Sequence, residues 1–190
     1  MKKRFLTLMM IATLCTCAAC GSSSSQADDS SYVIEDGTYY TGTGYEIELT
    51  DRWTPTELDN TDLAFLNKDS TNTDFTESLN VMVTEYQDKD INLELLKKNS
   101  LEDFKKLGYI IDETKKVTIG GNDSIALICH KENDGALIYF KQIFTVVDKS
   151  SYVFTFGAQK DDFDKLENEI TASFNTIKYG DYSKETSETD

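Results

Sequence analysis

The chain has 190 residues and a formal net charge of −15 at pH 7, with 34 acidic residues against 19 lysines and arginines. A field of this sign repels phosphate backbones and anionic lipid headgroups, which excludes nucleic acid as a partner and adsorption to a membrane through a basic patch. The length leaves room for one domain.

The first two dozen residues have the layout of a secretory signal. Lys2, Lys3 and Arg4 form a positive head, and an apolar run over 5–14 follows it. The apolar stretch is shorter than the ~20 residues that cross a bilayer, which disfavours an uncleaved membrane anchor. A cleaved leader over residues 1–19 is therefore predicted.

The end of this leader, Ala18-Ala19-Cys20-Gly21-Ser22, resembles the lipobox of bacterial lipoproteins. The resemblance implies cleavage before Cys20 and a thioether-linked diacylglycerol on its sulfur. Two alternatives stay open, a plain secreted protein and lipidation at Cys17, although Thr16 is a poorer cleavage residue than Ala19. A diacylglycerol supplies the two chains that stable anchoring takes, so the membrane is expected as a partner through Cys20.

Composition divides the rest of the chain into three parts. Residues 20–36 are Ser-rich after the lipidated cysteine and read as a flexible tether. Residues 37–178 are expected to form a single domain, and 179–190 an acidic, disordered tail. We expect the protein on the outer face of a bacterial cytoplasmic membrane, with a Gram-positive host favoured.

The cysteines exclude a disulfide framework within one mature chain. Cleavage removes two of the four cysteines, and Cys20 is committed to lipid, so Cys129 alone carries a thiol. Cys129 ends the apolar run that starts at Ile125, and a buried structural thiol is the favoured interpretation.

The first half of the domain predicts three strands and a helix. Residues 45–49 alternate apolar and polar, and 63–66 and 79–86 are the next strand candidates. Apolar residues near a 3.6 spacing then predict a helix over 92–107, with Gly108 as its C-cap. Ser100-Leu-Glu-Asp103 fits a capping box, so we expect the helix to break and restart there.

The second half predicts four strands, a helix and a last short strand. The four strands are 109–119, 124–130, 136–147 and 152–158, and their short, turn-rich connections require antiparallel neighbours. Phe163, Leu166, Ile170 and Phe174 recur on one face of a helix, and 173–177 closes the domain as a strand. The order β-β-β-α-β-β-β-β-α-β belongs to the α+β class.

This order, with certain residues, resembles the PsbP-like fold. The residues that carry the resemblance are structural: Tyr45 to Leu49 with Trp53, Ser100-Leu101, Val117 to Gly121, Gln142 to Phe144, Tyr152 to Phe156, and Phe163 through Phe174. The resemblance implies an α/β/α sandwich around a mainly antiparallel sheet. It brings no catalytic residues.

Candidate chemical groups are few. The single histidine, His130, ends a strand and is expected to be a rim residue making a hydrogen bond. Asp88-x-Asp90-x-Asn92 matches the start of an EF-hand loop, but Leu93 stands where the loop needs Gly and Asn99 where it needs Glu. We therefore interpret Asp88 and Asp90 as helix N-caps and expect no metal or other cofactor.

Two further groups have competing interpretations. Trp53, next to Arg52, is either a surface anchor for a partner or a core residue, and core packing is favoured. The acidic residues of the second predicted helix, Asp161, Asp162, Asp164, Glu167 and Glu169, are expected to form a solvated face.

These observations predict a membrane-tethered, non-catalytic binding or accessory module. Its partner would be an envelope protein, a wall component or a small ligand. An extracytoplasmic enzyme that uses carboxylates, with or without a metal, is the alternative from another class, and a calcium-binding surface protein is the third.

Overall fold

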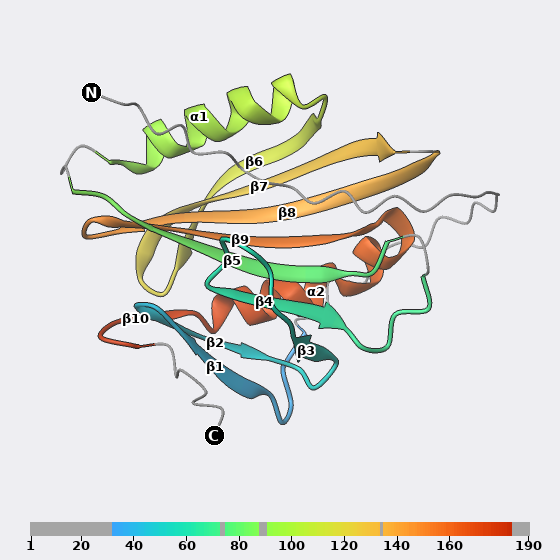
Figure 1. Ribbon diagram of the computed structural model, residues 1–190, viewed down its shortest axis with the longest axis horizontal. Coiled ribbons are helices and arrows are strands. Elements are labelled where there is room, and N and C mark those ends of the chain that lie inside the picture. The colour runs from blue at the N-terminus through green and yellow to red at the C-terminus, as the bar shows by residue number, and fades with distance from the viewer. Residues whose placement is uncertain (1–31, 73–74, 88–90, 134, 184–190) are drawn as a thin grey trace.

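The computed structural model describes residues 32–72, 75–87, 91–133 and 135–183. Two antiparallel sheets and two helices make up these parts of the chain (Figure 1). In chain order the elements are β1 (Thr38–Gly42), β2 (Tyr45–Leu49), β3 (Trp53–Pro55), β4 (Leu63–Asn67), β5 (Ser78–Glu85), α1 (Leu93–Lys106), β6 (Ile110–Ile119), β7 (Asn122–Asn133), β8 (Ala136–Val147), β9 (Ser150–Gln159), α2 (Lys160–Asn175) and β10 (Lys178–Tyr179).

The large sheet has seven strands in the order β3-β4-β5-β9-β8-β7-β6, and every neighbouring pair is antiparallel. Three consecutive hairpins join β6 to β9, as their short connections require. Gly120 and Gly121 make the first of these turns at φ 56° and 78°, a conformation that favours glycine. The predicted α+β sandwich with a mainly antiparallel sheet is confirmed.

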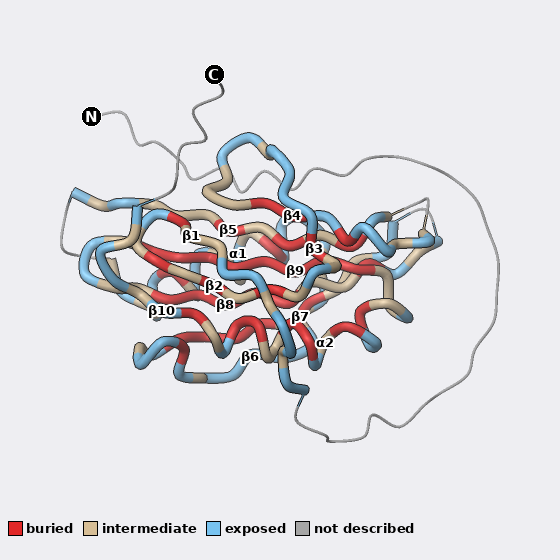
Figure 2. The backbone as a smooth tube through the Cα atoms, turned by 90° about the horizontal axis from the view of Figure 1, so that it is seen from below, coloured by how far each residue is buried: buried red, intermediate tan, exposed pale blue. Residues whose placement is uncertain are grey.

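The two faces of the large sheet have different covers (Figure 1). One face carries α2 and the small sheet, whose order is β1-β2-β10, and their side chains share one apolar cluster with the inner face of β9. The other face carries α1, which packs on β6, β7 and β8. We call these the α2 face and the α1 face. Burial on both sides explains why β9 is almost continuously buried (Figure 2).

Helix α1 runs without interruption, so the break predicted at Ser100 is wrong. Asn92 caps it, and the Asn92 side chain accepts a hydrogen bond from the Leu95 backbone N–H at 2.9 Å. Phe104, one turn beyond Ser100, is fully buried against the sheet. The burial of Phe104 stabilises the helical conformation past Ser100, and this outweighs the capping box that would otherwise start a new helix there. The C-cap is Leu107, one residue before the predicted position, and Gly108 follows it at φ 81°, the conformation that commonly ends a helix.

The end of the domain differs from the prediction for residues 173–177. Helix α2 continues to Asn175 because Phe174 extends its apolar face into the core, and the last strand is β10. Tyr179, assigned to the tail by composition, belongs to β10, and the backbones of Gly180 and Tyr182 bond to the small-sheet hairpin. Gly180 donates a backbone hydrogen bond to Gly44 at 3.2 Å, and the Gly44 N–H donates to Tyr182 at 2.9 Å. Strands β1 and β3 were not predicted.

Candidate functional site

The residues that the sequence singled out for lipid and calcium lie outside the described residues. These are Cys20, Asp88 and Asp90. Lipidation at Cys20 therefore stays a prediction. The residue that caps α1 is Asn92.

His130 lies on β7 and bonds to Asp112 of the neighbouring strand. The carboxylate oxygens lie 2.7 and 3.0 Å from the Nδ1 atom, and because a carboxylate only accepts, Nδ1 is the donor. The ring stacks on Tyr139 of β8, with ring centroids 4.9 Å apart. The predicted hydrogen bond of the histidine is confirmed, but His130 does not end its strand, because β7 continues to Asn133.

A β-bulge brings Asp112 to this position. The register of β6 against β7 shifts between Ile111 and Glu113, which leaves Asp112 unpaired in the ladder. Such a bulge re-aims a side chain, here toward the histidine. No signal in the sequence indicates the bulge, because both strands alternate imperfectly.

Glu169 of α2 is buried with 3% of its surface exposed, so its assignment to a solvated acidic face is wrong. Its carboxylate accepts hydrogen bonds from the Thr50 hydroxyl at 2.6 Å and the Trp53 indole N–H at 3.1 Å. The Arg52 guanidinium lies 3.2 Å away, and the Tyr32 hydroxyl lies 3.4 Å away. Four donors from the N-terminal part of the chain thus converge on one buried carboxylate.

This Glu169 cluster, with Thr50, Arg52, Trp53 and Tyr32, fastens the β2–β3 turn, the start of β3 and the segment before β1 to α2. Trp53 is 1% exposed and packs edge to face against Phe156, so core packing of the tryptophan is confirmed. A charged group out of water is stable only when its lone pairs are satisfied, and here they are. The cluster therefore holds the fold together.

A second buried charge links the same helix to the sheet. Lys141 of β8 is 4% exposed, and its ammonium donates to Glu167 at 3.0 Å and to the Thr171 hydroxyl at 2.6 Å. Both partners lie on α2, so the Lys141 charge is compensated on the α2 face.

Cys129 is fully buried on the α1 face, as predicted. Burial raises the pKa of its thiol to about 12 from an ordinary value of 9.0, and the negative charge of Asp112 adds to the rise. A thiol held neutral in this way is a poor nucleophile at neutral pH.

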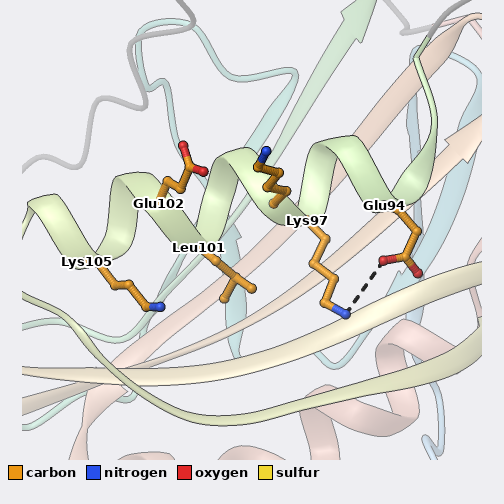
Figure 3. Close-up of a pocket in the computed structure, with 6 residues that line it drawn as sticks. Glu94, Lys97, Leu101, Glu102 and Lys105 are labelled. Atoms are coloured by element: carbon orange, nitrogen blue, oxygen red, sulfur yellow. Dashed lines mark ion pairs between the residues drawn. The ribbon is translucent and has the colours of Figure 1, made fainter.

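Two hollows on the α1 side are open to solvent. One, of about 300 Å³, lies along α1, where Glu94 pairs with Lys97 beside Leu101 and Lys105 (Figure 3). The other, of about 850 Å³, lies between the start of α1 and the β6–β7 hairpin. Charges of both signs line each hollow, so neither selects a cation or an anion.

Within the described ranges, no three His, Cys, Asp or Glu side chains come together as ligands for a metal ion. The two described helices are also too short or too polar to cross a membrane.

Comparison with known proteins identifies the fold. No protein-family model matches the chain, and no curated protein matches it in sequence. Among solved structures, cyanobacterial PsbP (CyanoP) from Synechocystis sp. PCC 6803 superposes with a TM-score of 0.60 at 14% identity, over 81% of this chain and 98% of that one. The fold is PsbP-like.

Two other structures share this PsbP-like architecture. LpqN of Mycobacterium tuberculosis, described as involved in cell envelope biogenesis, superposes with a TM-score of 0.60 at 14% identity, over 76% of this chain and 85% of LpqN. PA94 of Pseudomonas aeruginosa, a protein of unknown function, gives 0.53 at 16% identity, over 74% of this chain and 94% of PA94. At these identities the likeness concerns the fold alone.

The burial of Glu169 could have been predicted from its spacing in the sequence. It lies three residues after Leu166 and four before Ser173, both buried on the inner face of α2. Its hydrogen-bond partners Thr50 and Trp53 could not have been predicted from the sequence, because they lie more than 100 residues earlier, around the β2–β3 turn.

Proposed function

We propose that this protein is an extracytoplasmic accessory lipoprotein, anchored through Cys20, whose PsbP-like domain binds another envelope component without catalysing a reaction. The leader motif supports the extracytoplasmic location and the anchor. The resemblance of the fold to LpqN, a protein of cell envelope biogenesis, supports the accessory role.

One observation carries the non-catalytic part of the proposal: the groups best suited to chemistry are engaged in holding the fold. Glu169 accepts from Thr50 and Trp53, the Cys129 thiol is buried with a raised pKa, and the His130 ring stacks on Tyr139. An enzyme instead keeps such groups poised toward a cleft that binds substrate.

The anchor is tested by labelling living cells with an alkyne fatty acid. Three full-length chains are compared: the parent, Cys20→Ala and the matched control Cys17→Ala. We expect label on the parent and on Cys17→Ala, and loss of label from Cys20→Ala with release of that chain from the membrane fraction. Label that persists on Cys20→Ala would contradict the assignment.

The accessory role is tested by cross-linking in intact cells. The parent should cross-link reproducibly to one envelope component, and Cys20→Ala should lose that product because the unanchored chain leaves the membrane. A product of equal yield from both chains would contradict a role that depends on the anchor.

A further inference from the structure

Strand β6 forms one edge of the large sheet. Within the described residues it has a strand neighbour on one side only, which is β7. It spans ten residues, most of them exposed, whereas the opposite edge strand, β3, spans three and contains Pro55. A long exposed edge offers backbone groups to a further strand.

The side chains of β6 change sign at its middle. Asp112 and Glu113 precede Thr114, and Lys115 and Lys116 follow it. Glu113 and Lys115 point to the α2 face, because they alternate with Val117, which packs on the large apolar cluster of that face. Their side chains are 45% and 50% exposed and pair with each other at 3.3 Å within the chain. A solvated pair of this kind contributes little to stability, so it is readily exchanged for pairs with a neighbouring strand.

The surroundings of β6 are neutral in an otherwise acidic protein. From Leu93 to Asn133 the chain carries seven lysines and seven acidic residues, whereas the other described residues carry eighteen acidic and seven basic residues. Two copies of a chain with a net charge of −15 repel over most of their surfaces. The region of α1, β6 and β7 is where they can approach each other.

We infer that two copies of this chain associate through β6, which pairs with the partner's β6 in antiparallel fashion about a two-fold axis at Thr114. In this register Glu113 lies opposite the partner's Lys115, and Lys115 lies opposite the partner's Glu113. Opposite charges in directly facing positions stabilise a pair of strands, and like charges destabilise it. The symmetry makes the contact self-complementary.

Neighbouring registers are disfavoured by the same charges. An axis at Lys115 or at Lys116 would place two lysines directly opposite each other. The bulge at Asp112 also limits regular pairing to the residues around Thr114. The contact is therefore short and the association reversible. This inference does not depend on the lipid anchor or on the proposed accessory role.

Cysteine substitution tests the register. Facing residues of antiparallel strands have Cα atoms about 4.5–5.5 Å apart, within the range that a disulfide spans. Thr114→Cys in the full chain should form a covalent dimer under mild oxidation. Thr118→Cys, exposed on the same strand and the same face, is the matched control and should stay monomeric, since the two copies of residue 118 would lie more than 20 Å apart.

The parental chain, which keeps its own cysteines, sets the background in this experiment. A dimer from Thr114→Cys alone supports the register. Equal cross-linking of both variants, or no cross-linking of either, would overturn it.

A charge swap provides a test that does not need cysteine. Glu113→Lys or Lys115→Glu alone turns both cross-strand pairs into like-charge pairs, and sedimentation equilibrium should show association about tenfold weaker. The double variant Glu113→Lys with Lys115→Glu restores opposite charges across the axis and should restore association. Because both side chains are exposed, the single variants should fold normally by circular dichroism. If the double variant associates no better than the single ones, the inference fails.

Discussion

The two helices cover opposite faces of one sheet, yet they are bound to it very differently. Helix α2 buries six residues, among them Phe163, Phe174 and the charged Glu169. Helix α1 buries only Leu96 and Phe104 and leaves Leu95 exposed to solvent. Figure 1 shows the arrangement behind this contrast: the small sheet and α2 lie on one side of the large sheet, and α1 lies on the other.

The difference indicates which face contributes most to the stability of the fold and which face can contact another molecule. Apolar burial and satisfied buried charges concentrate on the α2 face, so global stability resides there. Elements with few buried contacts open at lower free energy than the core, which applies to α1. The segment of α1, β6 and β7, residues 93–133, carries equal numbers of lysines and acidic residues and contains the edge strand β6.

The largest expected effect separates the two faces directly. Phe154→Ala removes a fully buried ring that contacts Tyr45 and Phe174, and it should lower the free energy of unfolding by about 3–5 kcal/mol. Phe104→Ala removes an equally buried ring under α1, but its main effect should be local opening. Hydrogen exchange should then accelerate in α1 while β9 keeps its protection. Equal acceleration in α1 and β9 of Phe104→Ala would show that the two faces unfold as one unit.

The next effect concerns the buried carboxylate of α2. Glu169→Gln keeps the shape but removes the charge and one acceptor from a site with several donors, so we expect a loss of about 1–3 kcal/mol in urea unfolding. Glu102→Gln on the exposed face of α1 is the control and should change the free energy by less than about 0.5 kcal/mol. Similar losses in the two variants would show that the Glu169 cluster does not hold the fold together.

Alkaline pH tests the α1 face. The pKa of Cys129 is about 12 in the folded protein and 9.0 in its ordinary state, so the unfolded chain releases this proton first. The stabilisation that comes from the neutral buried thiol is complete below about pH 9 and is lost as the pH rises toward 12, by up to about 1.4 kcal/mol per unit. Above pH 10 the buried Tyr45 and Tyr179, whose pKa values burial also raises, add to the slope.

The measurement is urea unfolding between about pH 9 and pH 10, comparing the parent with Cys129→Ala. The variant should lose part of the downward slope whatever its stability at pH 7. An unchanged slope would mean that the thiol titrates normally in the folded protein, and thiol reagents should then label it without denaturant.

The smallest expected effect is on the surface of α1. Lys106 pairs with Asp103 at 3.1 Å, but the lysine side chain is 71% exposed and the pair is well solvated. Lys106→Met should therefore change the free energy of unfolding by no more than about 0.5 kcal/mol. A larger loss in thermal unfolding would mean that surface ion pairs contribute to the stability of α1.

Local patterns in the sequence were sufficient for most elements. The alternation at Tyr45 to Leu49, the helical spacing from Phe163 to Phe174 and the glycine turn at Gly120 each lie within one element or connection. Such patterns follow the side-chain period of a single helix or strand, so they can be recognised without knowing which elements pack against it. Strand β1 was missed because its residues are polar and half exposed, which leaves no alternation to detect.

The sequence by itself determined the acidity of the protein, its leader motif, its two helices and the antiparallel hairpins, because charge, composition and connection length need no third dimension. Only the tertiary structure decided that α1 runs through Ser100, that Glu169 is buried among distant donors and that a bulge turns Asp112 toward His130. These outcomes depend on which element covers which face of the sheet. The packing of elements on the sheet brings together residues more than a hundred positions apart, such as Trp53 and Glu169, and a local sequence pattern cannot predict such contacts.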